Sequence, residues 1–487
     1  MKYLSEIIKI MACTVENFTK DMEIRDISCK SHECEQGFVF AALKGENVDG
    51  HNYAFDAYKN GCRAFLVESK LNLPKDAIQI ITQNSRKALA VLSLFIYDSP
   101  HLKLKTIGVT GTKGKSIVVA MINRILNFSG IKCCSVGTIG ADFGTEFIKT
   151  ENSTPESYVI ARLLKKMVDL EAEVAVLEIS SQGIKQNRIY GLDFDAKVIT
   201  NLSNDHIGKG EHSNFEEYKN YKKDFLSGDV PCFINSDDKY SEEFKSVCPH
   251  KTYGIDSDAN FKAKNIEVKK LSHGYSSEFD LIANGKAHRI SIAIPGVFAV
   301  YNALAAISVC SHFGVSVETS ALALEGFTVE GRFEKIQIAQ DDVEIVIDYA
   351  HNEASLENAL STARMLTNQR IILVTGSVGE RTEIRRKGIG KVADRLSDYC
   401  VITSDNPNRE NPEVIALDIA REINKIPYKI ISNREEAIRH AINEAQSGDL
   451  VLIAGKGHER YQLIDGKKIQ FDERDIIKET IKNKIKT

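Results

Sequence analysis

The sequence predicts an α/β protein built from three successive domains. Three observations predict this class. Apolar, β-branched stretches alternate with amphipathic ones, a glycine-rich segment joins one such pair, and the alternation starts again late in the chain. A length of 487 residues fits about three domains of ordinary size. We place these domains at residues 1–102, 103–332 and 333–487.

The first range mixes short strands with helices. The stretches "GFVFAAL" and "CRAFLVES" have the composition of strands, whereas "NSRKALAVLSLFIYD" carries apolar residues at helical spacing. The opening "MKYLSEIIKIMAC" resembles a signal peptide, but Glu6 and Lys9 interrupt its apolar run, which favours an amphipathic helix. We expect "DSPHLKLK" to connect this range to the next.

The second and third ranges show the strand and helix alternation of parallel sheets. The expected strands of the second range are "LKTIGVTG", "CCSVGTIG", "VAVLEIS" and "AKVITNL". Those of the third range are "VEIVIDYA", "RIILVTGS", "YCVITSD", "YKIISN" and "DLVLIAG". Between residues 262 and 294 the pattern changes to alternating strands with a glycine-containing turn, which predicts an antiparallel insert.

Composition narrows the class of protein. The net charge of −4 gives no reason to expect a nucleic-acid partner, and no apolar run approaches the ~18 residues of a membrane span. The ten cysteines show no C-x-x-C pairing, which is typical of the reduced thiols of a cytoplasmic protein. A metal site at Cys29, His32 and Cys34 is disfavoured because a second ligand pair is missing. We expect a monomer.

The stretch "GVTGTKGKS" has the features of a phosphate-binding loop between a strand and a helix. Two glycines let the backbone approach an anion closely, Lys115 reaches the terminal phosphates, and Ser116 offers its hydroxyl to Mg²⁺. An ordinary glycine turn is the alternative, and Val109 stands where the common form of the motif has its first glycine. The expected ATP-binding residues of the loop are Gly111, Thr112, Lys113, Gly114, Lys115 and Ser116.

The loop resembles the T-G-T-x-G-K-[ST] segment of the Mur ligases, the ATP-dependent amino-acid ligases of peptidoglycan synthesis. Further motifs of this family follow in order: "NSTPES", "LEISSQGIKQNRI", "TNLSNDHIG", "YNALAA", "GRFEKI", "DYAHN", "SDNPNRENP" and "AGKGHERYQ". The series is similar to that of the MurE branch, the UDP-N-acetylmuramyl-tripeptide synthetases. The resemblance implies the three-domain Mur ligase architecture, with a central P-loop domain and a Rossmann-like C-terminal domain.

The resemblance implies an acyl phosphate, formed from ATP and captured by an amine. Its expected catalytic residues are Lys115, Glu178, His206 and Lys222, and its expected Mg²⁺ ligands are Ser116, Glu178, His206 and Lys222. Lys222 would be carbamylated by CO₂. The spacing from Phe215 and Tyr218 selects it over Lys219 and Lys223, although a helix face with three lysines is usually simply solvated.

The third domain would close over ATP. The resemblance assigns the γ-phosphate to Arg332, the ribose to Asp348, with His351 nearby, and adenine to Asn302. The family continues the aspartate motif with Thr-Pro, whereas this chain has Asn352 and Glu353, which leaves the local loop open.

The incoming amino acid is less determined. The resemblance gives Arg386, Asp405, Asn406, Asn408, Gly455 and Glu459 as its binding residues. Diaminopimelate-specific enzymes have D-N-P-R, in which the arginine fork binds the distal carboxylate. Here Asn408 takes that position and Arg409 comes one place later. The sequence therefore slightly favours L-lysine, with meso- or LL-diaminopimelate and other diamino acids left open.

The remaining expected residues bind UDP-MurNAc-L-Ala-D-Glu. They are Ser31 in the first domain and Ser153, Thr154, Ser180, Gln186 and Arg188 in the second. Arg188 is the expected partner of a substrate carboxylate, while Lys30 and His32 depart from the charges that flank Ser31 in the family.

Other classes of protein fit less well. An inactive Mur-like scaffold subunit would be expected to have lost Glu178, His206 or Lys222, and a P-loop kinase would not need the "DNP" and "GKGHE" segments. Folylpolyglutamate synthetases share the loop but usually lack the first domain.

Overall fold

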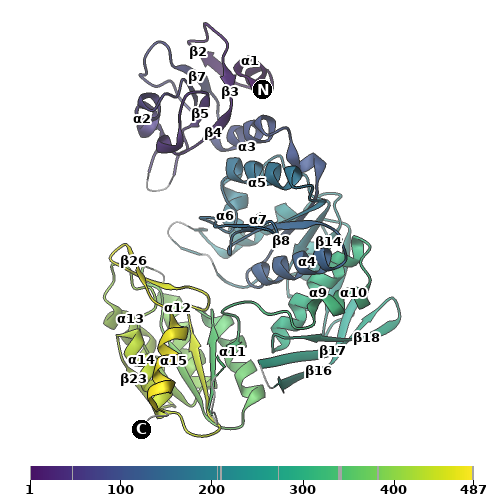
Figure 1. Cartoon of the computed structure of the whole chain (residues 1–487), viewed down its shortest axis with the longest axis vertical. Coiled ribbons are helices and arrows are strands. Elements are labelled where there is room, and N and C mark those ends of the chain that lie inside the picture. Colours follow the sequence, from purple (N-terminus) through teal and green to yellow (C-terminus); the bar gives the residue numbers. More distant parts are fainter. Residues whose placement is uncertain are drawn as a thin grey trace. The chain divides into compact units, whose positions relative to one another are not determined.

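A computed structural model describes residues 2–45, 48–205, 207–208, 211–271, 274–337, 343–380 and 383–484 (Figure 1). The chain forms two compact units. The first contains Met1–Asn260 and Ala305–Thr319, and the second contains Phe261–Leu304 and Ser320–Thr487. The domain boundaries expected at residues 102 and 332 remain predictions.

The first unit begins with a small sheet in the strand order β2-β7-β6-β5-β4, parallel except for β2. Its strands are β2 (Thr14–Glu16), β4 (Asp26–Ser28), β5 (Phe38–Ala41), β6 (Ala64–Val67) and β7 (Ile78–Ile81). The shorter elements nearby are β1 (Lys2–Tyr3), α1 (Leu4–Lys9), β3 (Glu23–Ile24), η1 (Ser31–Glu33), η2 (Gly50–Tyr53), α2 (Ala54–Lys59), α3 (Ser85–Ile96) and η3 (Pro100–Lys103). The helix predicted at the start of the chain is therefore present as α1.

The same unit contains a larger sheet in the order β11-β10-β9-β12-β8-β13-β14-β15. All neighbouring strands from β9 to β15 in this order pair in parallel, whereas β10 pairs antiparallel with both β9 and β11. Its strands are β8 (Lys105–Thr110), β9 (Cys133–Val136), β10 (Ala141–Asp142), β11 (Phe147–Ile148), β12 (Val174–Glu178), β13 (Ala196–Ile199), β14 (Cys232–Asn235) and β15 (His250–Gly254). Its helices are α4 (Lys115–Phe128), α5 (Ser157–Asp169), α6 (Ser181–Lys185), α7 (Phe215–Leu226) and α8 (Ser241–Lys245). The helices α9 (Val297–His312) and α10 (Val317–Leu324) each contain residues of both units.

The second unit contains the predicted antiparallel insert, formed by β16 (Phe261–Leu271), β17 (Gly274–Ala283) and β18 (Lys286–Ile292). Its main sheet has the order β19-β20-β24-β21-β22-β23, with every strand parallel except β19. These strands are β19 (Glu334–Lys335), β20 (Glu344–Asp348), β21 (Ile371–Thr375), β22 (Tyr399–Ile402), β23 (Tyr428–Ile430) and β24 (Leu450–Ala454). A hairpin of β25 (Tyr461–Ile464) and β26 (Lys467–Gln470) follows.

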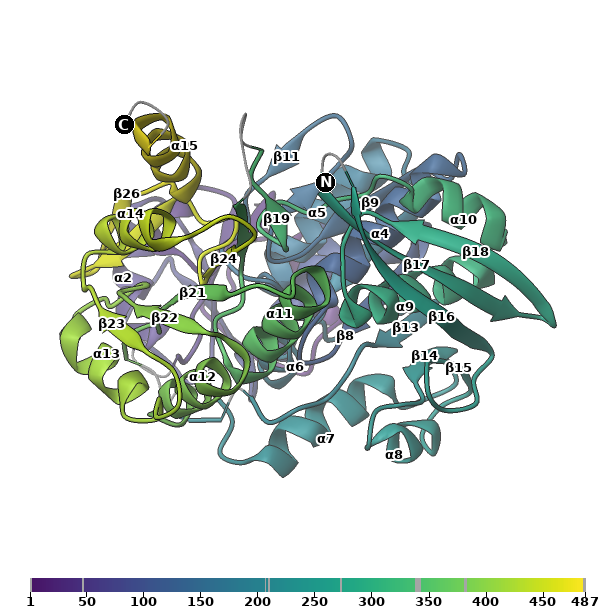
Figure 2. The ribbon, with the colours of Figure 1, turned by 90° about the horizontal axis from the view of Figure 1, so that it is seen from below.

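Helices cover both faces of this main sheet (Figure 2). Leu373 and its alternate neighbours pack against α11 (Glu353–Leu366), α12 (Glu383–Leu396) and α13 (Pro412–Ala420). Val374 and its alternate neighbours pack against α14 (Arg434–Glu444) and α15 (Glu473–Lys484). Burial on both faces explains why these strands are continuous apolar runs in the sequence.

Asparagine side chains begin many of the helices by accepting a backbone N–H of the first turn, as N-cap residues do. These caps are Asn84 for α3, Asn214 for α7, Asn352 for α11, Asn411 for α13 and Asn433 for α14. The predicted α/β class and the expected strands are confirmed. In the part of the chain that is described, no helix is long and apolar enough to span a membrane.

Candidate active site

The glycine-rich segment connects β8 to α4 and needs its glycines. Gly111 and Gly114 adopt φ angles of 141° and 86°, which side-chain-bearing residues rarely adopt. A Cβ atom on Gly111 would lie 1.9 Å from Thr200 Oγ1. The loop therefore packs directly against the segment that follows β13, the strand beside β8.

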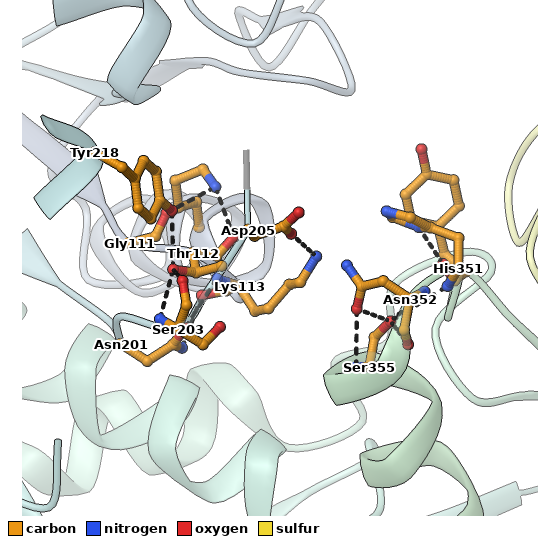
Figure 3. A network of polar contacts seen from close by, with 12 residues as sticks. Gly111, Thr112, Lys113, Asn201, Ser203, Asp205, Tyr218, His351, Asn352 and Ser355 are labelled. Carbon is orange, nitrogen blue, oxygen red and sulfur yellow. Dashed lines mark hydrogen bonds and ion pairs between the residues drawn. The ribbon is translucent and has the colours of Figure 1, made fainter. Parts of the chain in front are cut away.

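Hydrogen bonds fix the loop to that segment (Figure 3). The amide of Thr112 donates to Asn201 O at 2.8 Å, and the amide of Lys113 donates to Asn201 Oδ1 at 3.0 Å. The Lys113 ammonium lies 2.9 Å from Asp205 Oδ2, and Thr112 Oγ1 accepts the amide of Ser203 at 3.0 Å. The protein thus holds the loop in one conformation with its own groups.

A buried carboxylate faces the start of α4. Glu178 ends β12, on the other side of β8, and is 3% exposed. Its Oε2 accepts hydrogen bonds from Ser116 Oγ and from the amide of Thr138, both at 2.9 Å. A Cβ on Gly137 would approach the same oxygen to 2.7 Å. Serine and carboxylate oxygens lie together here, and such hard donors suit Mg²⁺.

Lys222 reaches the same loop from α7. The residue is 1% exposed, and its ammonium donates to Gly111 O at 3.0 Å and to Thr110 Oγ1 at 3.2 Å. Burial holds the pKa of Lys222 well below its usual range, and the nearby Lys115 ammonium lowers it further, while Glu178 acts in the opposite direction. Burial therefore favours the neutral form of this amine more than it does for an exposed lysine.

The two neighbouring lysines have other surroundings. Lys219 forms ion pairs with Glu216 and Glu243, each at 3.0 Å, and Lys223 is half-buried. The structure therefore brings Lys222, and neither of its neighbours, to the loop. His206, predicted as a metal ligand, lies outside the described residues. In the described ranges no group of three His, Cys, Asp or Glu side chains is arranged to hold a metal ion.

The segment predicted to bind the dipeptide contacts the backbone of Glu178. Thr154 Oγ1 donates to Glu178 O at 2.7 Å and accepts the amide of Ser180 at 2.9 Å. Ser153 Oγ lies 2.6 Å from Thr138 Oγ1, and Ser180 Oγ caps α6. Changes at this segment are therefore coupled to the position of the carboxylate.

Arg188 is held by protein groups. Its Nη1 donates to Thr154 O at 2.7 Å, and its Nη2 lies 2.7 Å from Gln186 Oε1 and 3.0 Å from Glu156 Oε1. Burial lowers the pKa of Arg188, which the Glu156 carboxylate opposes. Within the described residues its buried Nε has no hydrogen-bond partner.

Ser31 is the first residue of η1, the short helix between β4 and β5. Its carbonyl accepts the Asn60 side chain at 2.9 Å, and the adjacent Lys30 ammonium lies 2.7 Å from Glu151 Oε1. Glu151 belongs to the loop that precedes the dipeptide segment. The lysine that departs from the family pattern thus has an ion pair within the protein.

In the second unit, Asp348 ends β20 and accepts the amides of Phe333 at 2.7 Å and Ala350 at 2.8 Å. Burial raises the pKa of Asp348, and the nearby Arg332 guanidinium opposes the rise. Arg332 stacks over the Tyr349 ring, 4.8 Å from its centroid. Asn302 is 2% exposed, and its Nδ2 has no hydrogen-bond partner among the described residues.

The departure at Asn352 has a structural reason. Asn352 is the N-cap of α11: its Oδ1 accepts the amide of Ser355 at 3.1 Å, and the Ser355 hydroxyl reaches back to the capping residue (Figure 3). A residue with a short side-chain acceptor therefore serves here in place of Thr-Pro, and the loop after Asp348 keeps a defined helix start.

The "DNP" and "AGKGHE" segments follow β22 and β24 and meet directly. Gly455 has a φ of 124°, and a Cβ there would lie 2.9 Å from Asp405 Oδ2. Asn406 Nδ2 donates to Glu459 Oε2 at 3.0 Å. These predicted amino-acid-binding residues therefore form one cluster.

The arginines near this cluster do not present a free fork. Asn408 adopts a φ of 52° and donates from Nδ2 to Glu380 Oε2, whereas Arg409 is exposed. Arg386 is 3% exposed, and its two Nη atoms bind Glu410 at 2.6 Å and Asp418 at 3.0 Å. Its charge is already matched by carboxylates of the protein.

Sequence reasoning missed several residues that build these sites. Asn201 and Asp205 hold the phosphate loop, and their signal was the "TNLSND" motif, which was used only for the histidine that follows. Lys456 and Arg434, both fully buried behind the "DNP" segment, gave no signal, because burial of a charged side chain is not visible in a loop sequence.

Comparison with known proteins agrees with this geometry. Residues 109–310 match the Mur ligase middle domain, residues 331–457 match the Mur ligase glutamate ligase domain, and residues 23–98 match the Mur ligase family catalytic domain. A relative from Clostridium botulinum is 38% identical over 467 residues, covering 94% of this chain and 95% of that protein. The chain belongs to the Mur ligase family.

That relative is named UDP-N-acetylmuramoyl-L-alanyl-D-glutamate–2,6-diaminopimelate ligase, as is one from Bacillus velezensis with 36% identity over 98% of both chains. A solved structure with the same name has 25% identity and a TM-score of 0.66, covering 95% of this chain and 96% of that one. The MurF ligase from Thermotoga maritima in complex with ADP shares the fold, with a TM-score of 0.65 and 16% identity over 95% of this chain and 98% of that one. The predicted family and three-domain architecture are confirmed, whereas the preference for L-lysine is not.

Proposed function

We propose that this Mur ligase joins a diamino acid to the D-glutamate of UDP-N-acetylmuramoyl-L-alanyl-D-glutamate, using ATP. The observation that carries the proposal is the meeting of the phosphate loop, the Ser116–Glu178 contact and the buried Lys222 at the ends of three neighbouring strands. Ligands of open α/β sheets bind at this edge. The relatives' names support the same substrate.

The loop would hold the phosphates of ATP. The amides at the start of α4 and the Lys115 ammonium supply positive charge where phosphate oxygens would lie. Ser116 and Glu178 would hold Mg²⁺, which neutralises phosphate charge when bound. His206 and the carbamylated Lys222 complete the proposed ligand set. In the second unit, we assign ATP contacts to Asn302, Arg332 and Asp348.

Lys222 would carry a carbamate. A neutral amine attacks CO₂, forms a C–N bond and loses a proton, so a lysine with a strongly lowered pKa is suited to this reaction. The product is a carboxylate directed at the loop, a third oxygen donor beside Ser116 and Glu178. Lys222→Ala should therefore lose most activity and regain part of it with a short-chain carboxylic acid. Lys223→Ala, a change at the half-buried neighbour, is the matched control; full activity of Lys222→Ala would contradict the assignment.

The dipeptide would bind along Ser153, Thr154, Ser180, Gln186 and Arg188, with uridine near Ser31. In this proposal a substrate carboxylate accepts a hydrogen bond from the Arg188 guanidinium, which the protein already holds through Thr154 and Glu156. Because nucleotide precursors and ATP are cytoplasmic compounds, we place the reaction in the cytoplasm, and we propose that the enzyme is a monomer.

The amino acid would bind at Arg386, Asp405, Asn406, Asn408, Gly455 and Glu459. A second carboxylate on the ligand would meet Asn408 where an arginine fork is needed, and Arg386 already binds Glu410 and Asp418. An unpaired buried carboxylate costs roughly 2–5 kcal/mol. These contacts slightly favour L-lysine. The relatives' names favour diaminopimelate, which is the alternative substrate.

The deciding experiment measures phosphate release from ATP with the UDP-linked dipeptide and Mg²⁺, offering L-lysine, meso-diaminopimelate and LL-diaminopimelate separately. Release that requires both the dipeptide and one amino acid would establish the ligase and name its substrate. Release with the dipeptide alone would indicate a kinase. No release with any amino acid, in the presence of bicarbonate, would contradict the proposal and favour a scaffold subunit.

A further inference from the structure

One fully buried lysine lies between the two segments that form the amino-acid cluster. Lys456, in the "AGKGHE" segment, is 0% exposed. Its ammonium donates to Asn406 Oδ1 at 2.9 Å and to Glu459 Oε2 at 3.1 Å, and lies 3.6 Å from Asp405 Oδ1.

These contacts determine how the cluster presents its groups. Asn406 Oδ1 accepts from Lys456 and from the amide of Leu463, so its Nδ2 must face Glu459. Glu459 Oε2 in turn has two donors, Asn406 and Lys456. The lysine thereby fixes the amide orientation of Asn406 and one oxygen of Glu459, a carboxylate that the Tyr461 hydroxyl also contacts.

The same segment is held on its other side. A Cβ on Gly457 would lie 2.7 Å from Gly331 O and from Tyr349 Cβ, which flank the nucleotide residues Arg332 and Asp348. Behind it, Arg434 donates to Ser404 O at 3.2 Å and to Ala454 O at 2.8 Å. The backbone on either side is therefore fixed, and Lys456, together with the hydrogen bond from Asn406 to Glu459, links the "DNP" and "AGKGHE" segments.

We propose that Lys456 is a positioning residue for the incoming amino acid. Its ammonium holds Asn406 and Glu459 in the arrangement that accepts the ammonium groups of a diamino acid, and it offsets the negative charge of Asp405 and Glu459 in a buried site. This inference rests on the proposed function. It adds a residue that determines amino-acid affinity without contacting ATP.

The test compares two lysines beside the same aromatic ring. Lys456 lies 5.5 Å and the exposed Lys468 lies 4.5 Å from the centroid of Tyr461. Lys456→Met keeps the length of the side chain and removes its charge, and Lys468→Met is the matched control. A third variant, Ile442→Ala, weakens the α14 side of the same unit without touching either segment.

With the preferred amino acid, Lys456→Met should raise the KM for that amino acid at least about tenfold while the KM for ATP changes less than about twofold. Lys468→Met should leave both unchanged. An unchanged KM in Lys456→Met, or an equal rise in Ile442→Ala, would overturn the inference while the ligase activity of the unmodified enzyme stands. Absence of ligase activity in the unmodified enzyme would instead overturn the proposed function.

Discussion

The buried ion pair of Arg434 and Glu473 offers a quantitative test of the packing described here. Both side chains are 0% exposed, and Arg434 Nε lies 2.7 Å from Glu473 Oε1. The other guanidinium nitrogens bind the carbonyls of Ser404 and Ala454. Arg434→Met would remove these contacts and leave an uncompensated buried carboxylate, which costs about 3–5 kcal/mol.

The assay is urea unfolding of the full chain, monitored by a spectroscopic signal that reports on the second unit. Burial already raises the pKa of Glu473, so folding disfavours its charged form, which the Arg434 guanidinium opposes. A raised pKa contributes most at low pH, and the contribution is lost as pH rises through the folded-state pKa. The loss of stability in Arg434→Met should therefore be smaller at about pH 5 than at about pH 8.

Arg434→Met combined with Glu473→Leu should recover much of the lost stability, because no unpaired charge remains. A single variant that loses less than about 1 kcal/mol, or a double variant no more stable than the single one, would refute the view that the charge pair accounts for the loss.

Three further predictions concern single positions. Gly111→Ala should raise the Kd for ATP about tenfold or more, because the new Cβ meets Thr200 and the backbone strain at this φ costs about 1–3 kcal/mol. Calorimetric titration with ATP checks this prediction, and an unchanged Kd would contradict it. Burial lowers the pKa of His101 despite Asp193 nearby, so stability should fall as pH drops below about 6.5, and His101→Gln should flatten this fall in urea midpoints. Asn352→Ala should cost about 1 kcal/mol in thermal unfolding through loss of the α11 cap, and no change in Tm would argue against that role.

Much of the fold could be predicted from local pattern. Strands such as β8 and β24 are short apolar runs bounded by glycine, and alternation with helices indicates parallel pairing. The candidate site residues at the strand ends could then be predicted too, because ligands bind at the carboxyl edge of such a sheet. Glu178 and the phosphate loop were therefore placed correctly beside each other.

What the sequence did not show depends on which strands are neighbours and which side chains are buried. Asn201 contacts the loop only because β13 lies next to β8, an order that alternation does not determine. Lys456 stands between two glycines and has the composition of a solvated turn, yet it is fully buried. Arg386 was expected to bind the amino acid and Arg188 a substrate carboxylate, and the protein carboxylates that surround them come from other parts of the chain.

The fixed conformation of the phosphate loop has a thermodynamic consequence. Asn201 and Thr200 form three hydrogen bonds with the backbone of Lys113. A fourth runs from the amide of Thr112 to Asn201 O. The conformational entropy of the loop is therefore lost when the protein folds, and little remains to be lost when a nucleotide arrives. Nucleotide association at this loop should accordingly carry a small entropic penalty from the chain itself, so that its temperature dependence reflects the motions of other segments.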